Sequence, residues 1–239
     1  HKAPVVVLHG GSGSWTHWLR MLGPLTQAGH AVWALDLPGF GASDPLPHQQ
    51  DADDMLPLLA ASLQHWLPGQ ALQIMGFSLG GMTAALLAAA YPALVRQLVL
   101  VGPPGLGLRD KPLYRLKGWR HLADPVEQLL CHQYNLAALM LADARQIDRA
   151  TLALHTANVQ RDRLPRRRLA STDILRQTLP RITCPVQAVY GQEDVLYRGL
   201  WPQVAACFGG RLQLISGAGH WVQYEQPGVF AEAVLPMLL

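Results

Sequence analysis

The sequence predicts an α/β fold, namely a doubly wound, mostly parallel sheet that carries a helical cap insertion. Short apolar runs alternate with helix-like segments through most of the 239 residues, and the connections between them are short. The first of these runs is apolar at every position, which is typical of strands covered on both faces. The alternation stops between residues 103 and 178. We therefore expect a core of residues 1–102 and 179–239 and a helical cap of residues 103–178.

The first half of the chain supplies four expected strands and three expected helices. The first strand, Val-Val-Val-Leu, ends in a glycine-rich loop, and Gly29 is a plausible stop for the helix that follows. Asp51, Asp53 and Asp54 fall in the first turn of the second helix, where negative charge interacts favourably with the helix dipole. The expected strands are 5–8, 31–35, 71–75 and 97–102, and the expected helices are 15–27, 51–67 and 81–91.

Residues 103–178 interrupt this pattern with two helical stretches, 124–141 and 144–158, and the basic run 161–168. The basic run has two interpretations. It is a solvated face of the cap, or it steers an anionic acyl substrate towards a cleft. The sheet is expected to resume with strands at 186–190 and 211–215, and a helix at 227–239 closes the chain.

Composition argues against several classes of protein. A formal charge of +3 does not indicate a nucleic-acid partner, and no apolar run reaches membrane-spanning length, so we expect no membrane partner. Cys131, Cys184 and Cys207 lack metal-type spacing and are interpreted as buried thiols of a reducing compartment. We therefore expect a cytoplasmic protein that uses no metal and no other cofactor. The sequence leaves the oligomeric state open.

The stretch Gly-Phe-Ser-Leu-Gly at 76–80 organises the rest of the chain. An apolar run precedes it and an Ala- and Leu-rich segment follows it, so strand, tight turn and helix surround a G-x-S-x-G motif. In that context the turn lifts the hydroxyl of Ser78 above the sheet, and Gly76 and Gly80 leave room for it. The alternative is a Gly/Ser loop that matches by chance. The flanking elements favour Ser78 as a nucleophile.

A serine hydroxyl needs a base to take its proton and a third group to orient that base. Asp194 and His220 each follow an expected strand, at the sheet edge where the serine also lies. The chain order Ser, Asp, His is the one that this architecture uses. A buried structural histidine is the alternative for His220, and Glu193 competes with Asp194 for the acidic role.

The backbone of two loops is expected to bind a developing oxyanion. One donor is the N–H of Leu79, the residue after the nucleophile, and the other comes from the glycine-rich loop after the first strand. We choose Gly11 there, with Ser12 as the second choice. A plain strand-to-helix turn is the alternative. It rarely needs so many small residues unless something approaches its backbone.

Five ordered motifs together resemble the α/β-hydrolase superfamily over nearly the whole chain. They are His-Gly-Gly at 9–11, the turn 36–43, the elbow 76–81, the loop 191–194 and Gly-His-Trp at 219–221. The resemblance implies an eight-stranded sheet and a cap domain, and this chain begins at the family's third strand. Ser78 matches the family nucleophile. Epoxide hydrolases and haloalkane dehalogenases place aspartate there, so the resemblance does not extend to them.

Within the superfamily, the tail 219–225 is similar to the hydrolases of meta-cleavage products, which break C–C bonds in vinylogous diketones. Those enzymes carry an asparagine before the nucleophile and an arginine in the cap. Here Phe77 occupies the first position, and the second falls near His155. The elbow also resembles small bacterial esterases and cofactor-free perhydrolases.

We therefore expect a serine hydrolase that cleaves a small carboxylic ester through an acyl-enzyme. The alternatives are a C–C bond hydrolase of dienone acids that uses the same triad, and a catalytically silent fold that binds a small molecule. An apolar side chain beside the serine favours an uncharged acyl chain. The residues expected to bind substrate are Phe77, Trp221, His155 and Ser12.

Overall fold

The structure is a computed structural model that describes residues 2–48 and 50–238. Within these residues, six strands form one sheet in the order β2-β1-β3-β4-β5-β6, and every neighbouring pair is parallel. This confirms the predicted α/β class. The strands are β1 (Val5–Leu8), β2 (Val32–Leu35), β3 (Leu72–Phe77), β4 (Val95–Val101), β5 (Val186–Gly191) and β6 (Leu212–Ile215).

The strand order reverses between β1 and β3, because the chain moves from β1 outward to β2 and then returns to the other side of β1. Leu8, the last residue of β1, pairs with Leu35 on one side and with Gly76 on the other. The carboxyl ends of β1 and β3 are therefore level. Ligands of open α/β sheets bind at such a switch point.

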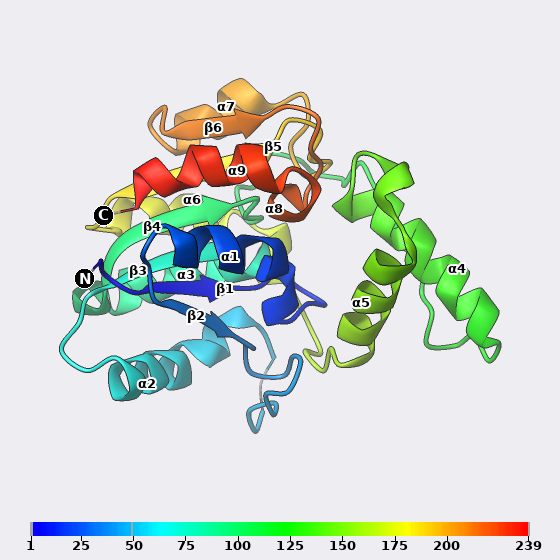
Figure 1. Cartoon of the computed structure of the whole chain (residues 1–239), viewed down its shortest axis with the longest axis horizontal. Coiled ribbons are helices and arrows are strands. Elements are labelled where there is room, and N and C mark those ends of the chain that lie inside the picture. Colours follow the sequence, from blue (N-terminus) through cyan, green and yellow to red (C-terminus); the bar gives the residue numbers. More distant parts are fainter. Residues whose placement is uncertain (1, 49, 239) are drawn as a thin grey trace.

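Helices cover both faces of the sheet (Figure 1). One face packs against α2 (Leu56–Trp66), α3 (Leu79–Ala90), α6 (Ile174–Thr178) and α7 (Trp201–Cys207), and the other against α1 (Leu19–Gln27), α8 (Val222–Glu225) and α9 (Pro227–Val234). Alternate residues of a strand point to opposite faces. Val6 and Leu8 therefore belong to the first cluster and Val5 and Val7 to the second.

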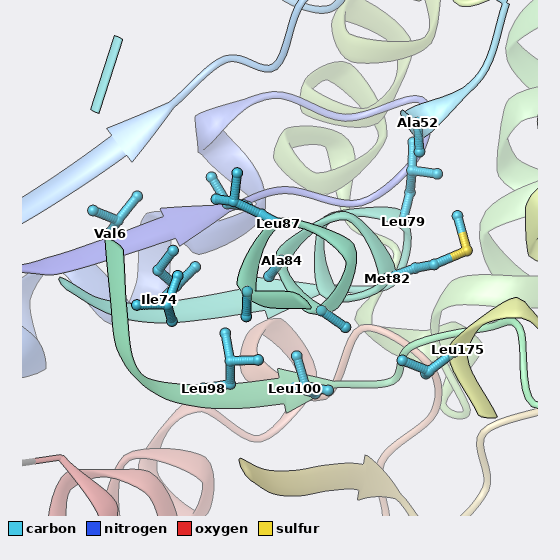
Figure 2. Packing of buried hydrophobic residues seen from close by; sticks show 14 of the residues in the cluster. Val6, Ala52, Ile74, Leu79, Met82, Ala84, Leu87, Leu98, Leu100 and Leu175 are labelled. Atoms are coloured by element: carbon cyan, nitrogen blue, oxygen red, sulfur yellow. The ribbon is translucent and has the colours of Figure 1, made fainter. Parts of the chain in front are cut away.

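The helix α3 packs directly on the middle of the sheet. Figure 2 shows Ala84 and Leu87 of this helix facing Val6, Ile74 and Leu98 of the strands. The small side chains of α3 allow a close approach, and the larger ones fill the space on either side. This packing holds the N-terminus of α3 directly after the end of β3.

Several expected helices are divided in the structure. A 3-10 turn, η1 (Trp15–Trp18), precedes α1, and another, η2 (Ala52–Met55), precedes α2. Ser14 and Asp51 cap these turns with their side chains. The other short turns are η3 (Pro92–Leu94), η5 (Ala144–Gln146), η6 (Leu169–Ser171), η7 (Leu179–Arg181) and η8 (Leu235–Met237). The closing helix α9 ends at Val234, and Leu239 lies outside the described residues.

Residues 103–178 contain no strand among the residues that the structure describes. The segment holds α4 (Pro125–Asn135), a π-helical turn η4 (Leu136–Met140) and α5 (Arg149–Gln160), and Figure 1 shows α4 and α5 apart from the layered body. Asp148 accepts the N–H of Thr151 at 2.7 Å and so starts α5 separately from η5. The end of the segment returns to the body, because Leu175 of α6 is fully buried in the core.

Candidate active site

Ser78 occupies the tight turn between β3 and α3. Its backbone has φ +51° and ψ −117°, a conformation that is strained for a residue with a side chain. A Cβ atom on Gly76 would collide with the Gly80 carbonyl, and one on Gly80 would collide with the carbonyl oxygens of Leu8 and His9 at the end of β1. Only glycine fits at both positions, so the spacing of the motif follows from the packing of strand against helix.

The structure brings His220 and Asp194 to Ser78. The Nε2 atom of His220 lies 2.9 Å from Ser78 Oγ, and its Nδ1 atom lies 2.8 Å from Asp194 Oδ2. Asp194 is fully buried, and its other oxygen accepts the N–H of Leu196 at 2.9 Å. The competing Glu193 is half-buried and instead lies 3.5 Å from the guanidinium of Arg198. The carboxylate therefore holds the imidazole with Nε2 towards the serine hydroxyl.

Two further residues lie close to the pair of His220 and Asp194, and the sequence motifs do not reveal their role. Glu225 is buried, and its carboxylate accepts the backbone N–H groups of Gly219 at 2.6 Å, Asp143 at 2.7 Å and Ala142 at 3.1 Å. It thereby ties the loop before His220 to residues 142–143. The only signal for Glu225 in the sequence is its place at the end of the 219–225 tail.

Gly102, directly after β4, is the second of these residues. It has φ +55°, and a Cβ atom there would lie 3.2 Å from both Asp194 Oδ2 and His220 Nδ1. A side chain at this position would crowd the His–Asp pair. The positive φ and the crowding come from the tertiary arrangement, so the strand pattern did not reveal them.

A cavity of about 640 Å³ opens over the serine. Ser78 and His220 line it, together with Gly11, Ser12, Phe77, Leu79 and His155, which were predicted to act as oxyanion donors or to contact substrate. The upper wall comes from residues of the 103–178 segment, among them Tyr114, Trp119 and Leu139. Residues that are far apart in the sequence thus meet in one cavity.

Trp221 was predicted to contact substrate, but it does not line this cavity. Its side chain is fully buried and stacks on Tyr224 with ring centres 4.0 Å apart. The indole N–H donates to the carbonyl of His17 at 2.9 Å, and the backbone N–H donates to the carbonyl of Met140. Trp221 therefore packs in the core behind the loop of His220 and does not face the cavity.

Two buried histidines hold the glycine-rich loop. His9 uses Nδ1 to donate to the Gly10 carbonyl at 2.8 Å, and its Nε2 accepts the N–H of Leu37 at 2.9 Å. Gly10 in turn donates its N–H to Nδ1 of His17 at 3.2 Å. Burial lowers the pKa of His9 to about 4 and that of His17 well below its usual value, so both rings are neutral.

His155 lines the cavity and is 7% exposed. Burial, together with the neighbouring His132, lowers the pKa of His155 to about 4. The ring is therefore neutral near pH 7 and offers hydrogen bonds but no charge. It does not substitute electrostatically for an arginine.

Arg167 is the residue of the basic run that lines the cavity among the described residues. A Cβ atom on Gly11 would lie 3.2 Å from Arg167 Nε, and this buried Nε has no hydrogen-bond partner in the described structure. The guanidinium also pairs with Asp162, whose carboxylate accepts the hydroxyl of Ser12 at 2.6 Å. The run therefore has one member beside the glycine-rich loop, a position that the sequence pattern did not single out.

The sequence of the chain matches a known family. A sequence profile described as "alpha/beta hydrolase fold" matches residues 3–126, which is more than half of the chain. The protein therefore belongs to the alpha/beta hydrolase fold family. In the described residues, no group of three or more His, Cys, Asp or Glu side chains is arranged to hold a metal ion, and no helix is long and apolar enough to cross a membrane.

The chain is similar to curated relatives and to solved structures over most of its length. A 2-hydroxy-6-oxo-6-phenylhexa-2,4-dienoate hydrolase of Comamonas testosteroni is 28% identical, over 98% of this chain and 87% of its own. A 2-hydroxy-6-oxononadienedioate/2-hydroxy-6-oxononatrienedioate hydrolase of Klebsiella pneumoniae is 26% identical, over 99% of this chain and 87% of its own. An esterase of Rhodococcus sp. ECU1013 superposes with a TM-score of 0.75 at 22% identity, over 99% of this chain and 90% of its own. An esterase of Thermogutta terrifontis superposes with a TM-score of 0.72 at 19% identity, over 98% of this chain and 89% of its own. At these identities the solved structures establish the fold alone.

Proposed function

We propose that the protein is a serine hydrolase that cleaves a small carboxylic ester through an acyl-enzyme. The observation that carries the proposal is the chain of hydrogen bonds from Ser78 through His220 to the buried Asp194. A base within hydrogen-bond distance of the hydroxyl, and a carboxylate that orients the base, are what nucleophilic serine catalysis requires.

In the proposed reaction, Ser78 Oγ attacks the ester carbonyl while Nε2 of His220 accepts its proton. Asp194 stabilises the imidazolium that forms. The backbone N–H groups of Leu79 and Gly11 bind the oxyanion, aided by the positive N-terminal end of α3. The imidazolium then protonates the leaving alcohol, and His220 activates a water that hydrolyses the acyl-enzyme.

We also propose that residues 103–178 act as a cap over the site. Tyr114, Trp119 and Leu139 line the cavity above Ser78, and α4 and α5 lie apart from the sheet. Glu225 ties residues 142–143 to the loop of His220, which would keep the cap in a constant position relative to the base. The end of the segment, α6, packs as part of the core.

Simple esters are the better substrates in this proposal. Phe77 beside the nucleophile forms no hydrogen bonds with a polar substrate, and His155 is neutral near pH 7. A buried carboxylate without a charged partner is costly, and Arg167 in the cavity wall is already paired with Asp162. The test is the ratio of kcat/KM for p-nitrophenyl butyrate to that for a meta-cleavage dienone acid. We expect a ratio above one, and a ratio below one would overturn the ester assignment.

Hydrolysis of a C–C bond is the second candidate, and two observations favour it. The curated relatives named above are hydrolases of dienoate compounds. Arg167 also brings a guanidinium into the cavity, although its pairing with Asp162 offsets part of the charge. Both reactions use Ser78, so the substrate ratio separates them. The absence of turnover on either class would instead favour a fold that only binds a ligand.

A further inference from the structure

Exposed apolar side chains are concentrated in one stretch of the molecule. Of eleven large apolar side chains that are exposed in the described residues, six lie between residues 113 and 134. Val126 and Leu130 are the most exposed, at 62% and 60%, and with Tyr134 they follow a spacing of four residues along one face of α4. We refer to the six as the apolar edge: Leu113, Leu116, Val126, Leu129, Leu130 and Tyr134.

Four residues of the apolar edge lie on α4, the outermost helix of the molecule (Figure 1), and Leu113 and Leu116 lie in the segment before it. The opposite face of α4 buries Cys131 and His132, so the exposed face is not the one that packs on the rest of the protein. A groove of about 770 Å³ separates α4 from residues 115–122, and it shares Leu116 and Lys117 with the cavity over Ser78. The edge is therefore adjacent to the cavity of the candidate site.

The charge of the molecule is divided unevenly between this region and the rest. Residues 103–178 hold thirteen Lys and Arg against seven Asp and Glu, a net charge of +6. The remaining residues hold six against nine, a net charge of −3. Arg115, Lys117 and Arg120 are exposed next to the edge, and Lys117 Nζ lies 4.0 Å from the ring centre of Tyr134. Glu127 and Asp124 are the acidic residues of the N-terminal end of α4.

We propose that the apolar edge and its flanking cations dock the protein on an anionic lipid surface. Apolar side chains of an exposed helix lower their free energy by entering the headgroup region, and lysine and arginine are attracted to anionic headgroups. A second copy of the chain fits less well, because a two-fold contact would bring two regions of charge +6 together. The expectation of no membrane partner rested on the lack of a spanning segment, which peripheral docking does not need.

Sedimentation of the full chain with vesicles tests this proposal. Vesicles of an equimolar mixture of phosphatidylglycerol and phosphatidylcholine should bind the protein, and vesicles of phosphatidylcholine alone should bind it much less. Binding to the mixed vesicles should weaken as salt is added, since salt screens the charges. The inference does not rest on the proposed reaction, so the Ser78→Ala protein should bind as the unaltered protein does.

Paired variants locate the surface. The double variant Val126→Ser, Leu130→Ser should bind the mixed vesicles roughly tenfold more weakly, because both side chains leave the lipid contact. Val229→Ser with Leu58→Ser is the matched control, since these side chains are exposed elsewhere, on α9 and α2. Arg115→Gln should weaken binding by about fivefold, and Arg96→Gln on β4 should not. Unfolding temperatures verify that each variant is folded.

Three results would overturn the proposal. The first is equal binding, or no binding, to mixed and pure phosphatidylcholine vesicles. The second is an equal loss of binding in the control pair on α9 and α2. The third is a stable oligomer that the Val126→Ser, Leu130→Ser variant dissociates, with no binding to vesicles. That last result would assign the apolar edge to a contact between copies of the chain.

Discussion

The polar side chains of the candidate site in the sheet core are hydrogen-bonded to one another, whereas most charged side chains of residues 103–178 are exposed to solvent. In the core, Ser78, Asp194 and His220 follow the ends of strands, and the carboxylate and both imidazole nitrogens have defined partners. In the segment, charged and apolar side chains face solvent together, and the region carries +6 against −3 for the rest. We infer that the core supplies the chemistry and that the segment selects what reaches it. Substitutions in the two regions should therefore have different signatures.

The largest expected effect is in the core. Ser78→Ala should lower kcat for ester hydrolysis on the order of a millionfold, because the covalent route is lost, while the fold is kept. The measurement is the steady-state rate on p-nitrophenyl butyrate, with a thermal melt to confirm folding. Retention of more than about one per cent of the activity would exclude Ser78 as the nucleophile. The reaction would then have to take place elsewhere in the protein.

The next effect distinguishes two neighbouring carboxylates. Asp194→Asn should lower kcat by roughly four orders of magnitude, because an amide at this position favours the wrong imidazole tautomer. Glu193→Gln, one residue away and half-buried, is the matched control and should change kcat by less than about twofold, since a surface ion pair contributes little. If the two effects were exchanged, Glu193 would be the orienting acid.

Much of the core arrangement could be predicted from the sequence because its signals are local. A buried strand is an uninterrupted apolar run, and the sharp turn at Ser78 demands glycine at 76 and 80. The apolar run and the need for Gly76 depend on neighbours in the sequence, whereas Gly80 is required by the carbonyls of Leu8 and His9, and the local motif records both. The short helix α7, with Pro202 in its first turn, was not predicted, because seven residues give too little periodicity to detect.

The walls of the cavity could not be predicted in the same way, because they depend on long-range packing. Arg167 lies beside Gly11 only because the chain returns over the glycine-rich loop more than 150 residues later. Trp221 was expected at the substrate from its position next to His220, but the turn into α8 directs its indole into the core. Local pattern does not encode which side of a loop faces a cavity.

A third prediction compares two neutral histidines, one in each region. His9 and His155 both have a pKa lowered to about 4 by burial, but His9 has partners at both ring nitrogens and Nδ1 of His155 has none in the described structure. An unfolded histidine takes up a proton below about pH 6.5, whereas each folded one does so only near 4. As pH falls between these values, each of the two histidines therefore lowers the free energy of unfolding by on the order of 3 kcal/mol.

His155→Leu should remove this contribution without breaking a backbone contact. Its free energy of unfolding should fall less than that of the unaltered protein between about pH 6.5 and 4, by on the order of 3 kcal/mol. The measurement is urea unfolding across that range. His65→Leu, at an exposed position on α2, is the control. An unchanged slope in the His155 variant would mean that His155 takes up its proton at the same pH in the folded protein as in the unfolded chain.

The smallest expected effect concerns Arg167, where the two regions meet. Arg167→Gln removes the guanidinium from the cavity but keeps a polar side chain. A charge-assisted hydrogen bond to a substrate carboxylate contributes about 1.5–3 kcal/mol, and pairing with Asp162 lowers that value here. We therefore expect kcat/KM for a dienone acid to fall by about tenfold, and kcat/KM for neutral p-nitrophenyl butyrate to change by less than about twofold.

Arg166→Gln is the matched control for this substitution, because Arg166 is an exposed neighbour that does not line the cavity. The neutral ester is the decisive substrate. Loss of Arg167 leaves the buried Asp162 with Ser12 and the N–H of Leu164, and a disturbed Ser12 would also move the loop that carries Gly11. An equal loss of rate on both substrates would therefore identify Arg167 as a support for the oxyanion loop. A loss of rate on the dienone acid alone would identify Arg167 as the residue of the 103–178 segment that binds the substrate carboxylate.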